Sequence, residues 1–172
     1  NEVHFFLFKK TLFGPEDTQQ FIPLLLQARK KGINTALVNR LLAELGHAEL
    51  ELHPGYALRI ETLGTFRVWR GQEEITEWQR TKAKELFQFF ITYSDRSFSK
   101  KEIVSTLWPD EDEKTAIRNV KVVMNALNNL LEPGRKSRAE PFFIKRDGEL
   151  YSLNRQAEIR IDINEFEQWV IA

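Results

Sequence analysis

The sequence contains no cysteine among its 172 residues, which excludes disulfide bonds and thiolate metal sites. It holds only three histidines, His4, His47 and His53, and they share no motif. No hydrophobic run approaches the roughly 20 residues that cross a bilayer, and the apolar stretch at 5–8 is too short for the core of a signal peptide. We therefore expect a cytoplasmic protein without a membrane partner.

The features of an enzyme are also lacking. The sequence shows no nucleophile–base pair, no cluster of metal ligands and no glycine-rich phosphate loop. Isolated carboxylates such as Glu85 and Glu102 are explained by surface and capping roles. We therefore expect no catalysis, no cofactor and no metal.

The chain is nevertheless rich enough in apolar residues to form a core. Its 42% hydrophobic content predicts one compact domain with an appendage. The formal net charge is zero, but residues 80–146 hold fourteen Lys or Arg against nine Asp or Glu, a net of +5. Overall neutrality argues against nucleic-acid binding, whereas this basic segment favours it. Because the chain begins at Asn1 rather than at methionine, we expect a fragment of a larger regulator chain.

Residues 1–50 predict a helical segment that ends an upstream helical domain, and residues 51–56, which include Pro54-Gly55, predict a linker. The first part of this segment, residues 1–13, is apolar and aromatic without a clean period. Helix and strand both stay open there.

Two short helices are expected within the helical segment. The first covers residues 21–31, where Pro23 is tolerated only in the first turn. The second is capped by Asn34 and ends at Gly46. It carries a stripe of leucines at Leu37, Leu41, Leu42 and Leu45.

An alternation of period two begins after the linker and predicts β-strands at 57–63, 65–70 and 74–76. Apolar and charged residues alternate along the first strand, in the order Leu58, Arg59, Ile60 and Glu61. The pattern predicts a small antiparallel meander with one apolar face.

Three helices are predicted to follow. The first covers residues 80–93, with a core side made of Ala83, Leu86, Phe87, Phe90 and Ile91. Ser99 and Glu102 spell a capping box that begins the second, and Pro109 ends it. The third covers about 112–131.

A β-hairpin is predicted from strands at 142–146 and 149–153. The Asp147-Gly148 dipeptide between them favours a type I′ turn. Lys145 and Arg146 lie near the tip, so the hairpin is expected to act as a wing that contacts DNA. The alternative is an ordinary edge hairpin.

The helix at 112–131 is the main functional signal because its two faces differ. One face is apolar, with Ala116, Val120, Val123, Leu127, Leu130 and Leu131 at spacings of three and four. An arginine can form two hydrogen bonds with the O6 and N7 atoms of guanine in the major groove, and an asparagine can do so with the N6 and N7 atoms of adenine. The predicted base-contacting residues on the other face are Arg118, Lys121, Asn125 and Asn128. A merely solvated face is the alternative.

Further cations lie at the starts of the two preceding helices. Cations there oppose the helix dipole, which favours an anionic partner such as phosphate. A helix N-terminus flanked by lysines also binds phosphate. The predicted contacts to the DNA backbone are Arg80, Lys82, Lys84, Lys100 and Lys101 at these helix starts, together with Asn129 near the end of the helix at 112–131. Solvated basic residues are the alternative.

Four segments, in order, resemble the winged-helix DNA-binding domain of the OmpR/PhoB type, in the variant of SARP-like bacterial activators. They are LRIETLGTFRVWRGQEEI, RTKAKELFQFFI, SKKEIVSTLWPDEDEKTAIRNVKVVMNAL and FFIKRDGELYSLN. The segment DINEFEQW resembles the start of the activator domain that follows, so residues 157–172 are expected to begin that domain or to form a C-terminal extension. Residues 20–46 resemble, less closely, the last helices of a tetratricopeptide-like region.

The resemblance implies an α+β fold: a winged helix-turn-helix over residues 57–156, with an N-terminal antiparallel β-meander and a C-terminal β-hairpin wing, preceded by a short α-helical segment. It implies that the helix at 112–131 enters the major groove of double-stranded DNA in a bacterial transcriptional activator. RNA polymerase and the rest of a larger regulator chain are further expected partners, and tandem DNA sites allow a dimer.

The sequence departs from the family at the end of this helix. The family often places arginines there, whereas this chain has Ala126, Leu127, Asn128 and Asn129. The departure motivates an alternative function, in which the winged-helix module binds RNA polymerase or another subunit without binding DNA.

Overall fold

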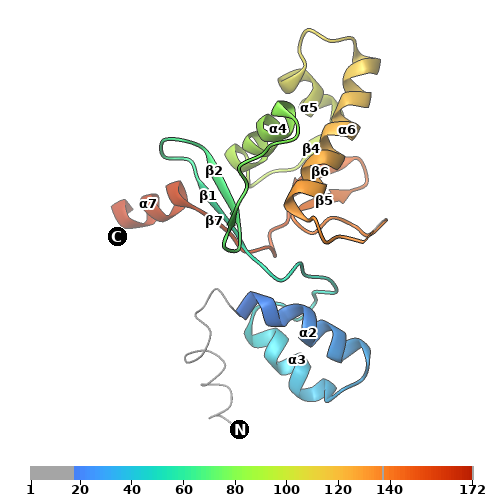
Figure 1. Cartoon of the computed structure of the whole chain (residues 1–172), viewed down its shortest axis with the longest axis vertical. Helices are drawn as coiled ribbons and strands as arrows, with labels where there is room; N and C mark the ends of the chain where they lie inside the picture. Colours follow the sequence, from blue (N-terminus) through green and yellow to red (C-terminus); the bar gives the residue numbers. More distant parts are fainter. Residues whose placement is uncertain (1–17, 137, 172) are drawn as a thin grey trace. The chain divides into compact units, whose positions relative to one another are not determined.

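The computed structural model describes residues 18–136 and 138–171, and it shows an α+β chain with two small sheets (Figure 1). The stretch 1–13, whose structure the sequence left open, and His4 lie outside the described residues. The elements, in chain order, are α2 (Thr18–Lys30), α3 (Thr35–Glu44), β1 (Leu58–Glu61), β2 (Arg67–Arg70), β3 (Glu73–Glu74), α4 (Thr81–Thr92), β4 (Phe98–Ser99), α5 (Lys100–Leu107), α6 (Glu113–Leu131), β5 (Ile144–Asp147), β6 (Leu150–Leu153), β7 (Ile159–Ile161) and α7 (Asp162–Ile171).

The chain divides into two compact units. The first contains the described residues up to 75 together with residues 158–171, and the second contains residues 76–157. The meander β1–β3 thus belongs with α2, α3 and α7, whereas α4, α5, α6 and the hairpin form the second unit.

The two N-terminal helices differ from the sequence-based expectation at their starts. Because α2 begins at Thr18, Pro23 lies in its second turn rather than its first, so the expected place of Pro23 was wrong. Asn34 does precede α3, but it adopts a left-handed conformation with φ 40° and its side chain makes no capping hydrogen bond. Gly46, with φ 77°, follows the helix end as expected.

The leucine stripe predicted for α3 is only partly correct. Leu42 is buried, but Leu37 is exposed, and Val38 is buried in addition. Leu41 and Leu45 are half-buried, so only Leu37 departs from the predicted stripe and Val38 takes its place.

The first unit contains a four-stranded sheet in the order β3-β2-β1-β7. β1 and β2 pair antiparallel, with Ile60 opposite Val68, which confirms the meander. β7 pairs with β1 in parallel, with Leu58 opposite Ile159. This parallel pairing of the C-terminal segment with the meander was not predicted from the sequence.

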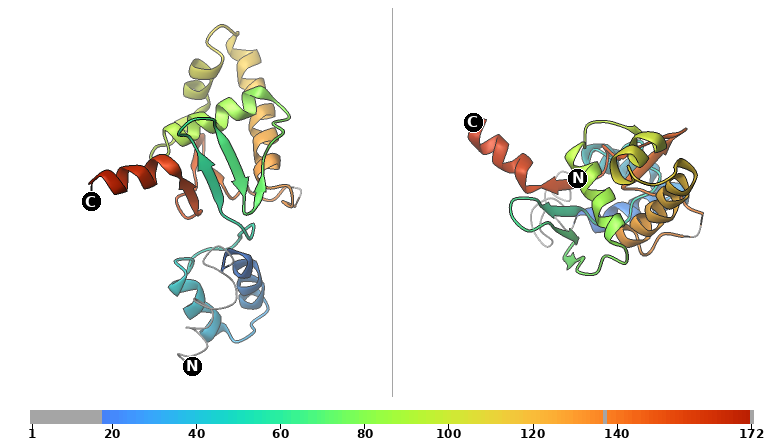
Figure 2. Two further views of the ribbon diagram at one scale, coloured as in Figure 1. Left: turned by 60° about the vertical axis from the view of Figure 1, so that its left-hand side comes forward. Right: turned by 90° about the horizontal axis from the view of Figure 1, so that it is seen from above.

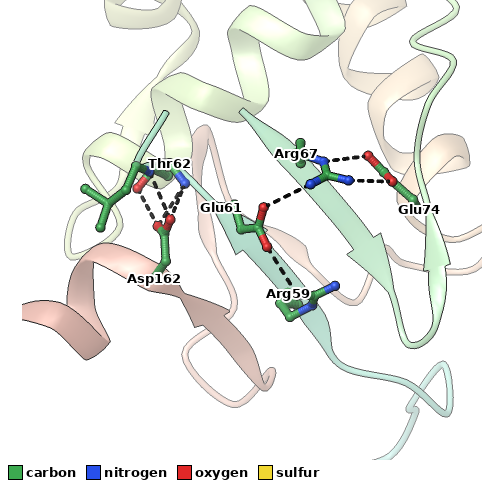
Figure 3. A network of polar contacts seen from close by, with 7 residues as sticks. Arg59, Glu61, Thr62, Arg67, Glu74 and Asp162 are labelled. Carbon is green, nitrogen blue, oxygen red and sulfur yellow. Dashed lines mark hydrogen bonds and ion pairs between the residues drawn. The ribbon is translucent and has the colours of Figure 1, made fainter. Parts of the chain in front are cut away.

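The two faces of this sheet separate apolar from charged residues, as the alternation predicted. Leu58, Ile60 and Val68 are buried on one face. The other face carries a chain of ion pairs from Arg59 through Glu61 and Arg67 to Glu74, with dashed lines in Figure 3. The Arg59 guanidinium lies 3.7 Å from the centre of the Trp69 ring, so this arginine covers the aromatic surface of its own sheet.

Asp162, at the start of α7, joins this helix to the end of β1 (Figure 3). Its carboxylate accepts hydrogen bonds from Thr62 N (2.8 Å), Thr62 Oγ1 (2.6 Å), Leu63 N (2.9 Å) and Ile163 N (2.8 Å). Burial disfavours the charged carboxylate, but these hydrogen bonds outweigh burial and lower the pKa of Asp162.

The second unit packs α4 and α5 against α6, and the three helices lie together in both views of Figure 2. All five residues predicted for the core side of α4 are buried. A three-stranded sheet in the order β4-β6-β5 completes the unit. Largest among the fully buried side chains of this unit are Phe87, Phe90 and Phe143.

The hairpin β5–β6 forms as expected, but its turn is shifted by one residue. Asp147 pairs with Leu150, so the two turn residues are Gly148 and Glu149 rather than Asp147 and Gly148. Gly148 has φ 57° and Glu149 has no positive φ. This pattern matches a type II′ turn, in which glycine takes the first central position, and not the predicted type I′ turn.

Among the described residues, no helix is both long enough and apolar enough to cross a membrane.

We predict that Asp162→Ala lowers the free energy of unfolding by about 1–2 kcal/mol, because it removes the acceptor for several hydrogen bonds at a helix start. The lowered pKa adds a pH dependence. The contribution of Asp162 is present above the ordinary aspartate pKa and is lost as pH falls through the lower folded-state value. Urea denaturation at several pH values measures both effects.

Thr62→Val is the matched control, since it removes one side-chain donor to Asp162 and keeps the carboxylate. It should cost less than Asp162→Ala and should leave the acid dependence in place. Equal stability of wild type and Asp162→Ala at neutral pH would contradict the assignment.

Candidate nucleic-acid interface

The position of α6 is fixed at its start by its cap and along its length by its apolar side. The Asp112 carboxylate accepts hydrogen bonds from Lys114 N and Thr115 N at 3.1 Å each, and the bond from Thr115 lowers the pKa of Asp112. Five of the six residues predicted for the apolar face are buried: Ala116, Val120, Val123, Leu127 and Leu131. The sixth, Leu130, is only half-buried. This side packs against α4 and α5, so the opposite side is turned to solvent.

The start of α5 has the predicted capping box. Ser99 Oγ accepts a hydrogen bond from Glu102 N, and Glu102 Oε2 accepts one from Ser99 N at 2.8 Å. The bond from Ser99 lowers the pKa of the Glu102 carboxyl. α5 ends at Leu107, and Trp108 is buried beyond it. An exposed acidic turn then leads into α6.

Three of the predicted base-contacting residues share the solvent side of α6. Arg118, Lys121 and Asn125 are all exposed. None of their side chains makes a hydrogen bond or an ion pair with any residue that the structure describes. Their guanidinium, ammonium and carboxamide groups are therefore available to an external partner.

The fourth predicted base-contacting residue, Asn128, was assigned wrongly. Its side chain is only 7% exposed, and its Oδ1 atom is buried without a hydrogen-bond partner among the described residues. At about 100° per residue, Asn128 lies about 20° from Lys121 around the helix. The border between the two faces thus runs between these residues, and Asn128 belongs to the buried side.

Asn129 is exposed but already has a partner. Its Oδ1 atom accepts a hydrogen bond from Arg135 Nη2 at 3.0 Å. The amide therefore helps to hold the basic loop that follows α6, which includes Lys136 and Arg138.

The cations at the start of α4 are in three different situations. Arg80 is exposed, and its side chain makes no hydrogen bond or ion pair with a described residue. Lys84 is half-buried. Lys82 Nζ donates to Glu85 Oε2 at 2.7 Å and to the Leu107 carbonyl at 2.8 Å, so it joins α4 to the end of α5.

Lys100 and Arg146 converge on one carboxylate at the hairpin tip. Lys100 Nζ lies 2.8 Å from Glu149 Oε2, and Arg146 Nη2 lies 2.9 Å from Glu149 Oε1. Hydrogen bonding and charge from Lys100 hold the pKa of Glu149 below its usual range. The Lys100 side chain is only 17% exposed. These contacts tie the turn of the hairpin to the start of α5.

Lys101 and Lys145 complete the predicted set. Lys101 is 82% exposed, and its ammonium lies 3.8 Å from Glu113 in a loose ion pair. Lys145 is half-buried, with its ammonium 5.8 Å from the centre of the Phe142 ring. Of these two side chains, Lys101 is the better placed for a phosphate.

A residue that sequence reasoning missed fixes the chain after α6. The carboxylate of Glu132 accepts hydrogen bonds from Phe142 N at 2.7 Å and Phe143 N at 3.0 Å, and its side chain is only 5% exposed. Burial raises the pKa of Glu132 in spite of these bonds and of nearby Arg135. In the sequence, Glu132 differs in no visible way from a solvated helix-end glutamate.

Within the described part of the chain, no three His, Asp or Glu side chains gather into a group that could hold a metal ion. No protein-family model matches the chain, and no curated protein matches it either. The side chains of α6 and its neighbours therefore carry the functional inference.

We predict that Glu132→Ala lowers the free energy of unfolding by about 2–4 kcal/mol, because it leaves two buried N–H groups without an acceptor. Glu132→Gln keeps one acceptor oxygen and should cost less. Urea denaturation of both variants measures the difference. Equal losses for Ala and Gln would show that the two hydrogen bonds contribute little.

The same pair of variants tests the raised pKa. The protonated form of Glu132 is favoured in the folded state, so its contribution is present below the ordinary glutamate pKa and is lost as pH rises through the folded-state value. Wild type should lose stability with rising pH in this window relative to Glu132→Gln. Parallel pH profiles would contradict the assigned direction.

Proposed function

We propose that the chain binds double-stranded DNA in a sequence-specific manner through a winged helix-turn-helix, with α6 in the major groove and the β5–β6 hairpin as the wing. The order helix, strand, two helices and hairpin in the second unit supports this arrangement. A major groove about 12 Å wide admits one α-helix. On this proposal, the exposed Lys101 at the start of α5 lies beside the DNA backbone.

The observation that carries the proposal is the set of exposed side chains on α6 that have no partner among the described residues. Arg118 offers the paired donors that guanine O6 and N7 accept, and Asn125 offers the donor and acceptor that match adenine N6 and N7. Lys121 adds a cation to the same side. A helix surface made for water alone usually mixes acids with bases at i,i+4, whereas this side has no carboxylate after Glu113.

The phosphate contacts that we propose are fewer than the sequence indicated. Lys82 and Lys100 are held in contacts between elements, so they serve the module rather than the DNA. Exposed cations remain at Arg80, Lys101, Lys114, Lys136 and Arg138.

The wider role that we propose is that of a bacterial transcriptional activator, and it rests on the resemblance to the OmpR/PhoB and SARP-like families. RNA polymerase and further parts of a larger regulator chain are the proposed protein partners, and the cytoplasm is the proposed location. Two modules on tandem sites would lie about one helical turn of DNA apart.

A second candidate function is a protein-interaction module without DNA binding. It is favoured by the internal ion pairs of Lys82, Lys100 and Arg146, which withdraw positive charge from the surface. The same module would then present Arg118, Lys121 and Asn125 to an acidic protein surface.

We predict that DNA binding weakens steeply with salt. If about four to six phosphates are neutralised, the slope of log K against log salt concentration should be about −4 to −5. Gel-shift titration of the whole chain at several salt concentrations measures this slope. Affinity that does not change with salt would contradict the proposal and favour the second candidate.

We further predict different effects of two surface substitutions. Asn125→Ala should reduce discrimination at one base pair by about 1–3 kcal/mol, because a bidentate base contact is lost. Lys101→Ala should weaken binding to all duplexes alike, because it removes a phosphate contact. Binding to a selected duplex and to its single-base variants distinguishes the two.

Lys31→Ala is the matched control, because Lys31 is an exposed cation of the first unit. It should leave affinity and base preference unchanged. Uniform loss of affinity in Asn125→Ala would remove Asn125 from the base-contacting set.

A further inference from the structure

Val122 stands out on the solvent side of α6 because it is apolar and 42% exposed. Sequence reasoning assigned it to neither face. Every other exposed residue among the described residues of α6 is polar or charged: Glu113, Lys114, Thr115, Arg118, Lys121, Asn125 and Asn129.

Val122 lies next to Arg118 on the solvent side of α6, toward one edge of the arc that the exposed residues form. At about 100° per residue, it lies about 40° from Arg118 and about 60° from Asn125 around the axis. Four-residue and three-residue spacings also make these side chains neighbours along the helix. Val122 therefore lies about one helical turn from both Arg118 and Asn125 along the same side of α6.

Neither packing nor helix propensity accounts for a valine at this position. Its side chain is excluded from the core that Val120, Val123 and Leu127 form. Valine is also a weaker helix former than alanine, lysine or glutamate, because its branched side chain has little freedom in a helix. Single exposed apolar residues are common on protein surfaces, but this one is surrounded by groups suited to base edges.

We propose that the Val122 side chain contacts the C5 methyl group of a thymine in the major groove, beside the bases contacted by Arg118 and Asn125. The inference rests on the proposed DNA binding and names the base that one position would select. Thymine is the one base with a methyl group at the major-groove edge, and apolar side chains distinguish it there. The bound site should accordingly contain an A·T pair whose thymine methyl is covered.

The test uses the whole chain and a duplex enriched from a random pool. Each thymine of that duplex is replaced in turn by deoxyuridine, which keeps the base pairing and removes only the methyl group. At one position, the wild-type Kd should rise by about three- to fivefold, the change expected for one methyl group no longer buried.

Val122→Ala identifies the side chain that covers this methyl group. Alanine has the higher helix propensity, so the variant is expected to fold, and a thermal unfolding curve checks this. For Val122→Ala, the rise in Kd on deoxyuridine replacement should be clearly smaller than for wild type, because the shorter side chain covers less of the methyl group. Leu63→Ala, at an exposed apolar residue of the first unit, is the matched control and should keep the full deoxyuridine effect.

The outcomes separate this inference from the proposed function. A deoxyuridine effect that is reduced in Val122→Ala alone supports the methyl contact. A deoxyuridine effect that is equal in wild type and in Val122→Ala overturns it, and so does a wild type that responds to no thymine position, while salt-dependent binding still stands. If the pool yields no enriched duplex, DNA binding itself fails and the methyl contact fails with it.

Discussion

The burial of one side of α6 is the constraint on which the rest of the second unit depends. Its apolar residues pack against α4 and α5, and burying several such side chains contributes about 1.5–3 kcal/mol each. A rotation of the helix about its axis would expose them. The same packing therefore fixes which residues face solvent, so the core and the candidate DNA-contacting surface are two consequences of one helix orientation.

The parts beside α6 are held by polar contacts that use the chain's own charges. Asp112 fixes the start of the helix, Glu132 binds the chain that leads into the hairpin, and Glu149 joins the hairpin tip to Lys100 of α5. Such contacts hold a binding surface in one geometry before a partner arrives, which lowers the cost of binding. These contacts also hold basic side chains such as Lys100 in internal ion pairs. Fewer cations are therefore available to phosphates than the basic composition of residues 80–146 indicates.

The sequence predicted those features that depend on local pattern. The core side of α4, the capping box and the strand alternation were confirmed because residues within a few positions of one another determine them. Long-range pairing was not predictable, since no local signal joins β7 to β1 or Lys100 to Glu149. The prediction for Asn128 was wrong for a different reason. Asn128 lies at the border between the two faces of the helix, where a small rotation decides whether a side chain is buried.

The most direct test of DNA binding by α6 is an NMR titration of the ¹⁵N-labelled chain with a duplex enriched from a random pool. The account predicts that the shifted amide signals concentrate on the solvent side of α6, around residues 114–129, and on the hairpin at 144–153. Signals that shift only in residues 18–75 and 158–171, with α6 unchanged, would contradict it.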